Sequence, residues 1–521
     1  MIELVREKIN MLRVKSRATS QLTFDEDYNV PDVKPDIGRM IQNKGEVRIE
    51  EIKLSENKAW VRAFLVVDLL YVGEAEEGKV YSLTAKIPIE ENLNLEGIES
   101  GDKICLKWDI EDLSLHLIHS RKLNVKSIVT FYAVVDEPGT LALPVGMKDP
   151  EGLSVRKKTV RLMELAVHKK DTLRVREEVN LASNKPNIYE VLWNTMEVRG
   201  LDIRGEEGNV SVRGELFLFV LYAGDDEGNP LQWMEHSIPF HGEVECEGCT
   251  LEMIPDVEVT VASQGLEVKP DADGEERTMQ ADVVLELDMK IYQEREHEML
   301  LDVYTPLKEC IPHGRTEMLE HLLVRNFSKC RVSDRVRIPR AQEKILQICH
   351  SCGSVKIDDS RVVENGILVE GVVQVKVLYI VGNDDMPFYS AEFMVPFSHT
   401  VEASGIGKDC VYRLHTDLEQ LSTTMADSSE IEIKLIMNVN VLVVEQTQEQ
   451  IIDHVDEAPL DMEKIQNMPG ITVYFIKPGD TLWDIARTFY TTVEQIKEMN
   501  GLETEEVQTS QPLILVKKVE N

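Results

Sequence analysis

Apolar and polar positions alternate over long stretches of this chain, and the alternation is clearest in residues 431–444. The apolar positions of that segment are Ile431, Ile433, Leu435, Met437, Val439 and Val441. A period of two places these side chains on one face of an extended strand, where they can be buried together. Runs rich in β-branched residues at 125–135 and 282–292 have the same character. The pattern therefore predicts three buried β-strands that close three similar stretches of chain.

Three short landmarks recur along the chain in one order and with nearly one period. KPDI at 34–37 returns as KPNI at 185–188 and, in diverged form, as IPRA at 338–341; the prolines are Pro35, Pro186 and Pro339, which lie 151 and 153 residues apart. The other two landmarks recur after 151 and then 157 residues, and they are Tyr71, Tyr222 and Tyr379, and Pro88, Pro239 and Pro396. A long fixed period of this kind indicates a structural unit that is present in three copies.

Turn sequences between the apolar runs predict antiparallel pairing within each copy. Residues 206–209, 226–229 and 364–366 place acidic residues, asparagine and glycine between paired apolar runs, which is typical of hairpin loops. We therefore predict a mainly β protein with three tandem antiparallel repeats, each a β-sandwich or barrel. Their predicted bounds are 1–145, 155–300 and 305–445.

The landmark residues have a structural interpretation. A tyrosine at the end of a buried strand usually packs and forms a hydrogen bond, and a proline that opens a strand usually marks an edge or a bend. We expect residues 37–41 and 188–192, directly after the first proline landmark, to form one short helical turn each. We expect the tyrosines and prolines to hold the repeats together rather than to bind a ligand.

The pattern changes after the third repeat. Residues 446–470 are acidic, lose the alternation and contain two prolines, which is typical of a linker. Ile471, Val473 and Phe475 then alternate as a short first strand, and residues 513–516 form a second one. Two helices are predicted between them. The chain should therefore end in a small βααβ domain at 471–518.

Capping residues define the ends of these two helices. Thr481 can accept a hydrogen bond from the first-turn amides, and Asp484 favours the positive end of the helix dipole. The residues on one buried stripe of the first helix are Leu482, Ile485, Ala486 and Phe489. Thr492 and Gln495 have capping-box spacing in the second helix, and Asn500-Gly501 suits a left-handed end. So small a unit is better suited to bind an extended ligand than to enclose a reaction.

Composition narrows the classes of function. The 521 residues include 57 Lys and Arg against 93 Asp and Glu, and a formal net charge of −36 repels phosphate backbones, so we expect no nucleic-acid partner. The start MIELVREKIN lacks the apolar core of a secretory signal, and no stretch approaches the ~20 apolar residues of a membrane span. Eight cysteines in so long a chain fit a reducing compartment. We therefore expect a cytoplasmic protein.

Sequence patterns of catalysis or metal binding are weak. Cys246-x-x-Cys249 and Cys349-x-x-Cys352 are the serious zinc candidates, since two such pairs can build a tetrahedral site. The pairs occupy different points of the repeat, so we expect free thiols instead. The prediction is no catalytic residue, no metal site and no cofactor.

The C-terminal domain carries a specific motif. Its residues are Tyr474, Lys477-Pro478-Gly479-Asp480-Thr481-Leu482, Ile485-Ala486, Asn500 and Gln511-Pro512-Leu513. This order resembles the LysM family, a βααβ fold that binds glycans containing N-acetylglucosamine. The resemblance implies a glycan groove with Gly479, Asp480, Thr481 and Leu482 on one wall and Asn500, Gly501 and Leu502 on the other. Ser510-Gln511 stands where the family usually has Gly-Gln.

A second candidate surface lies on the flank of the first helix. Trp483 is about 100° around the helix from the buried stripe, and Arg487 and Tyr490 follow at i+4 and i+7. An aromatic residue, an arginine and a second aromatic residue together are typical of a protein-interface hot spot. We therefore predict that Trp483, Arg487 and Tyr490 dock a partner; packing of Trp483 on the preceding linker is the alternative.

Three related β repeats followed by one LysM domain resemble clostridial spore-coat morphogenetic proteins of the SipL type, whose repeated unit is the SPOCS domain. The resemblance implies a non-enzymatic scaffold of spore-coat assembly in the mother-cell cytoplasm, at the forespore surface. Its LysM domain would dock on a basement-layer coat ATPase of the SpoIVA type, so that the protein joins this ATPase to the outer forespore membrane and the nascent coat; other coat proteins are further implied partners. A peptidoglycan- or N-acetylglucosamine-binding protein of the cell wall or spore cortex is the alternative.

Overall fold

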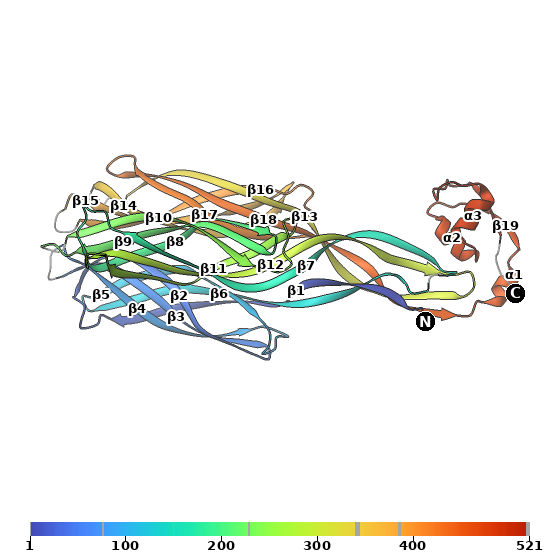
Figure 1. Ribbon diagram of the computed structural model, residues 1–521, viewed down its shortest axis with the longest axis horizontal. Helices are drawn as coiled ribbons and strands as arrows, with labels where there is room; N and C mark the ends of the chain where they lie inside the picture. Colours follow the sequence, from blue (N-terminus) through green and yellow to red (C-terminus); the bar gives the residue numbers. More distant parts are fainter. Residues whose placement is uncertain are drawn as a thin grey trace.

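The computed structural model of the chain describes residues 2–74, 78–149, 151–227, 230–338, 344–383 and 387–516, apart from the side chain of Lys464. Figure 1 shows three β-rich repeats lying side by side and a small C-terminal domain beyond one end of them. Repeat 1 comprises β1 (Leu4–Asn29), β2 (Ile37–Ser55), β3 (Lys58–Gly73), β4 (Val80–Asn94), β5 (Ile104–His119) and β6 (Lys122–Met147). Repeat 2 comprises β7 (Ser154–Asn180), β8 (Ile188–Glu206), β9 (Asn209–Gly224), β10 (Leu231–Glu245), β11 (Ile254–Pro270) and β12 (Glu276–Tyr304). Repeat 3 comprises β13 (Glu309–Arg337), β14 (Ile345–Val363), β15 (Gly366–Val381), β16 (Phe388–Glu402), β17 (Cys410–Met425) and β18 (Glu430–Ala458).

Each repeat consists of two three-stranded antiparallel sheets. In repeat 1 the sheet orders are β1-β6-β5 and β2-β3-β4, and repeats 2 and 3 have the same topology. The apolar faces of both sheets meet in one core, in which Phe131 of β6 and Leu65 of β3 are fully buried. The alternating residues of 431–444 occupy the equivalent place in β18 and are buried. The predicted antiparallel sandwich and the three buried closing strands are therefore confirmed.

The hairpin at 206–209 connects β8 to β9, with Gly208 at a φ of 76°, and the turn at 364–366 connects β14 to β15, with Asn365 at a φ of 57°. Both residues thus occupy the left-handed region that such turns require. The third predicted hairpin, at 226–229, includes residues 228 and 229, which lie outside the described residues.

The predicted helical turns at 37–41 and 188–192 are wrong, because β2 and β8 begin at Ile37 and Ile188. Two register shifts occur close together in the β2–β3 ladder, between Ile37 and Arg39 and between Met40 and Gln42. The β8–β9 and β14–β15 ladders have the same two shifts. Two β-bulges three residues apart give a helix-like spacing of apolar side chains within an extended strand.

The tyrosine and proline landmarks form a clamp at the start of these strands. The buried Tyr71 donates a hydrogen bond from its hydroxyl to the carbonyl oxygen of Pro35 at 3.0 Å, and Tyr222 does the same to Pro186 at 3.2 Å. An arginine completes each clamp: Arg121 donates to the carbonyl oxygen of Lys34, and Arg277 to that of Lys185. The landmarks are therefore structural in repeats 1 and 2. The third proline landmark, Pro339, lies outside the described residues.

The three repeats meet in one central apolar cluster. Each repeat contributes four equivalent positions: Ile41, Leu192 and Cys349; Leu70, Leu221 and Leu378; Val72, Ala223 and Ile380; Val80, Leu231 and Phe388. The first set consists of the residues skipped at the second bulge, so the bulge aims them out of the sandwich and into the cluster. Repeat 2 adds Phe219, which stacks on His350 of repeat 3 with ring centroids 3.9 Å apart. The cluster thus has an approximate threefold arrangement within a single chain.

The long first and last strands of the repeats extend beyond the sandwiches and converge in a narrow shaft (Figure 1). Three two-stranded ribbons, β1–β6, β7–β12 and β13–β18, build this shaft. Its core residues are Ile9, Met11, Leu141, Leu143, Val160, Leu162, Met299, Leu319 and Ile451, drawn from all three repeats. A lone two-stranded ribbon has no second surface on which to bury its apolar face, so the three ribbons stabilise one another.

The third repeat extends further than predicted. The predicted linker at 446–470 is wrong over its first half, because β18 continues to Ala458 and pairs with β13 as far as Glu309. Only residues 459–470 connect the shaft to the C-terminal domain, and they include the short helix α1 (Met462–Asn467), whose Ile465 is buried. Within the described part of the chain, no helix has the length and apolar character needed to cross a membrane.

Candidate docking site

The C-terminal domain has the predicted βααβ order. Strand β19 (Ile471–Phe475) pairs antiparallel with β20 (Pro512–Val516), and α2 (Leu482–Thr488) and α3 (Val493–Asn500) lie between them in the chain. Leu482, Ile485 and Ala486 of the predicted stripe are buried in the domain core, and Phe489 is partly buried against it. The apolar face of β19 points away from the domain core, because Ile471, Val473 and Phe475 are all exposed.

The predicted helix caps are confirmed. Thr481 Oγ1 accepts a hydrogen bond from the backbone N–H of Asp484 at 3.2 Å. Thr492 and Gln495 form a complete capping box at the start of α3, and Gly501 ends that helix in the left-handed conformation at a φ of 62°. These caps are local in sequence, which is why the sequence pattern predicts them.

The first wall of the predicted groove is the turn that leads into α2. Gly479 adopts a φ of 91°, and Asp480 Oδ2 accepts hydrogen bonds from the Tyr474 hydroxyl at 2.7 Å and from the Lys477 N–H at 2.9 Å. The hydrogen bond from Tyr474 lowers the pKa of the Asp480 carboxyl group, followed in effect by that from Lys477. Leu482 is buried in the core. Asp480 and Leu482 thus hold the turn in place, and Thr481 caps the helix.

The second wall also has a structural role. Asn500 Nδ2 donates to the carbonyl oxygen of Ile514 at 2.9 Å, and Asn500 Oδ1 accepts from the Ile514 N–H at 2.7 Å. The side-chain amide of Asn500 therefore bonds to the edge of β20 as the backbone of a neighbouring strand would. Gly501 supplies the helix end, and Leu502 packs against the domain core. The predicted groove residues form the scaffold of the domain, and their capacity for glycan stays a prediction.

The predicted docking flank of α2 contacts the end of the shaft. Trp483 Nε1 donates a hydrogen bond to Asp302 Oδ2 at 2.8 Å, and Arg487 Nη1 lies 3.1 Å from the same oxygen. The Trp483 indole also meets the Tyr304 ring edge to face, with centroids 4.7 Å apart. Tyr490 is partly buried and takes a left-handed backbone conformation at a φ of 54°. The Trp483 indole is partly buried and packs on the last residues of β12, whereas the alternative interpretation places it on the linker.

Two residues of repeat 2 thus belong to this site, and sequence reasoning missed both. Asp302 accepts from the indole and the guanidinium, and Tyr304 is buried within the core of the C-terminal domain. Asp302 lies 181 residues before Trp483. A contact of that separation leaves no periodic signal in the sequence. The aromatic residue at the end of β12, Tyr304, is the one sequence feature that could have indicated an apolar contact at this point.

The two CxxC pairs do not meet. Cys246 and Cys249 are buried in one part of the core of repeat 2, while Cys349 lies in the central cluster between the repeats. Burial raises the pKa of the Cys249 thiol to about 11, and that of Cys349 and of Cys352 to about 12. Burial thus favours the protonated form of these thiols, and Cys246 and Cys249 belong to a different apolar cluster from Cys349.

Comparisons with known families agree with this architecture. A family described as the SipL, SPOCS domain matches residues 36–118, 187–269 and 344–426, and the LysM domain family matches residues 474–515. Each SPOCS match covers the four inner strands of a repeat, β2–β5, β8–β11 and β14–β17, and leaves out the two long strands that build the shaft. No curated protein and no solved structure matches the chain.

Proposed function

Because the chain carries three SPOCS domains of the SipL family and a C-terminal LysM domain, we propose that it is a non-enzymatic scaffold of spore-coat assembly. It acts in the mother-cell cytoplasm at the forespore surface, where the LysM domain docks on a coat ATPase of the SpoIVA type. The SPOCS repeats then present a surface for other coat proteins. The observation that carries this proposal is the position of the LysM domain, which lies beyond the sandwiches at the end of the shaft and contacts the last residues of β12 there.

The geometry of the LysM domain favours contact with a protein. Asp480 and Asn500 use their polar groups to hold the domain together. Trp483, in contrast, offers a large aromatic surface, and Arg487 offers a charged guanidinium group. Tryptophan and arginine are both frequent at the centre of protein interfaces. In the structure this pair is satisfied by Asp302 of the same chain. A partner that binds the pair must offer an acidic group and an aromatic face in place of Asp302 and Tyr304.

This arrangement makes the shaft end a competitor of the partner. The domain binds its partner only while the Trp483 flank is free. The apparent association constant is therefore the intrinsic one multiplied by the fraction of molecules whose flank is free. Removal of Asp302 raises that fraction. Removal of Trp483 deletes the docking surface itself.

The test is calorimetric titration of the full chain with the purified coat ATPase. We expect Trp483→Ala to weaken binding by roughly thirtyfold, the equivalent of about 2 kcal/mol. We expect Asp302→Ala to strengthen binding by up to about tenfold. Glu296→Ala is the matched control, because Glu296 lies on the same strand and, among the described residues, its side chain forms an exposed ion pair with Arg161. Normal binding by Trp483→Ala contradicts docking through this flank, and retention of the chain on chitin oligomers that is lost in Thr481→Ala points to glycan recognition instead.

A further inference from the structure

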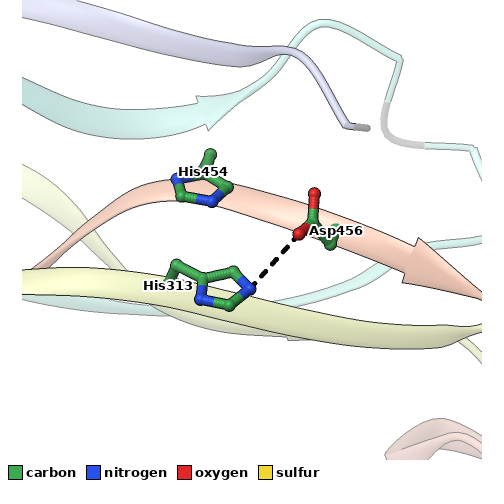
Figure 2. A group of neighbouring side chains, drawn as sticks. All are labelled: His313, His454 and Asp456. Atoms are coloured by element: carbon green, nitrogen blue, oxygen red, sulfur yellow. Dashed lines mark ion pairs between the residues drawn. The ribbon is translucent and has the colours of Figure 1, made fainter.

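Three potential metal ligands gather on the shaft, close to the point where the chain leaves it for the LysM domain. His313 of β13 and His454 of β18 are direct partners in the antiparallel ladder, and Asp456 follows two residues after His454. Figure 2 shows the two imidazole rings one above the other, with the carboxylate of Asp456 at the edge of the His313 ring. The ring centroids are 4.6 Å apart and the ring planes are within 12° of parallel.

The distances are those of a site that can close on an ion. Each of the three residues offers one ligand atom, and these atoms lie within 4.8 Å of one another. His313 Nε2 and Asp456 Oδ2 are already 3.3 Å apart, which equals the edge of a tetrahedron whose ligands lie about 2.0 Å from the metal. An ion must lie close to the plane of each imidazole that binds it, so His454 completes the set by turning its ring out of the stack with His313, and its exposed position on the shaft surface allows this turn.

An ion pair between His313 and Asp456 does not account for the whole group. It uses His313 alone, and within the described part of the chain the recorded partner of His454 is the stacked His313 ring. The same ribbon offers a comparison in His321 and Glu445, which also face each other across β13 and β18. That pair is an ordinary imidazole–carboxylate contact without a second histidine.

The ladder brings the backbone positions of the three ligands together before any ion arrives. Cross-strand partners and residues two apart share one face of a ribbon, and the register shift beside His313, which skips Asp453, adjusts the local twist. His313 and Asp456 each keep about 47% of their side-chain surface exposed, so an ion has a path of entry. A net charge of −36 also draws cations towards the chain.

We propose that His313, His454 and Asp456 bind one divalent transition-metal ion such as Zn²⁺. Two imidazole nitrogens and one carboxylate oxygen suit Zn²⁺, whereas Ca²⁺ and Mg²⁺ require oxygen ligands throughout. Three protein ligands leave a fourth position for water or for a group on a partner. The bound ion joins β13 to β18 two residues before β18 ends at Ala458. This inference departs from the sequence-based expectation that the chain has no metal site.

The experiment uses the untagged full chain, stripped with a chelator and titrated with Zn²⁺ by calorimetry. We expect one Zn²⁺ per chain and a rise of the melting temperature with Zn²⁺ concentration, because the ion binds the folded state. His454→Ala and Asp456→Asn are expected to weaken the affinity by at least roughly tenfold to a hundredfold each, because the loss of a direct ligand costs no less than the loss of an outer-shell partner. Mg²⁺ should give no heat of binding at the same concentrations.

His321→Ala is the matched control, because it removes an imidazole beside a carboxylate from the same ribbon and leaves the proposed ligands intact. It should bind Zn²⁺ like the wild type. All three changes lie on partly exposed side chains, so circular dichroism should show folded variants in each case. An equal loss of affinity in His321→Ala, or stoichiometric Zn²⁺ binding by the His313→Ala, His454→Ala double variant, would overturn the proposal.

Discussion

Asp256 of β11 is nearly buried where repeat 2 meets β17 of repeat 3. Its carboxylate accepts a hydrogen bond from His415 Nε2 at 2.8 Å and another from the guanidinium of Arg413. Burial alone raises the pKa of such a group, but the hydrogen bond from His415 and the charge of Arg413 together hold the pKa of Asp256 well below its usual range. Arg413 also donates to the hydroxyl of Tyr292. One ionised carboxylate thus organises the contact between two repeats.

The depressed pKa of Asp256 makes the stability of this contact depend on pH. The stabilisation is fully present above the pKa of the unfolded state, near 4, and is lost as pH falls towards the lower pKa of the folded state. We expect Asp256→Asn to lower the free energy of unfolding by about 3 kcal/mol at pH 7, and the gap from the wild type to narrow below about pH 4. Urea unfolding of the wild type and of Asp256→Asn between pH 7 and pH 3 measures the loss of stability and its dependence on pH. Asp282→Asn, which removes a surface partner of Arg174, should have little effect at any pH.

At the scale of elements, the sequence predicts what depends on neighbouring residues. Alternation in 431–444 located the buried face of β18, and capping residues located α2 and α3. The end of β18 was missed because a ribbon in the shaft buries few side chains: between residues 446 and 458 only Ile451, Ile452 and Val455 are buried. The bulges of β2 and β8 and the contact of Trp483 with Asp302 depend on strands and residues far away in the chain, so no local pattern indicates them.

Gly371 shows how closely two strands of repeat 3 approach. A Cβ at this position in β15 would lie 2.1 Å from the carbonyl oxygen of Lys356 in β14. We expect Gly371→Ala to destabilise the protein by roughly 1–3 kcal/mol, because the backbone must move to admit the methyl group. Gly265→Ala is the control, since that position in β11 has open space around it, and its effect should lie within about 1 kcal/mol of zero. Thermal unfolding compares the stability of the two variants with that of the wild type. An equal loss of stability in both would contradict the steric argument.

At the scale of the whole molecule, we expect the three repeats to unfold as one cooperative body and the LysM domain as a second. The repeats share the central cluster and the core of the shaft, whereas the LysM domain has its own core and borrows mainly Tyr304. The chain between them, 459–470, is short and contains one buried apolar side chain of α1, Ile465. A cut in this connection removes few contacts.

Two fragments test this division. We expect 1–460 to stay folded and monomeric after removal of the LysM domain, because the central cluster and the shaft remain complete. We expect repeat 2 alone, 154–304, to associate or unfold, because it exposes Phe219 and Leu221 of the central cluster and Leu162 of the shaft. Size-exclusion chromatography and thermal unfolding distinguish the two results. A monomeric 154–304 fragment that melts with the intact chain would show instead that each repeat is independent.

The junction of β18 with the LysM domain has a mechanical consequence. If a partner pulls on the LysM domain while the repeats are held elsewhere, the force enters β18 at Ala458 and runs along the strand. β13 lies antiparallel beside it from Glu309 to Arg337, and the hydrogen bonds of such a ladder lie across the strands. A load along the strand axis therefore shears many bonds at once instead of opening them one after another. We therefore expect the shaft to resist tension along its axis, and under load the LysM contact with Asp302 should yield long before the ribbon does.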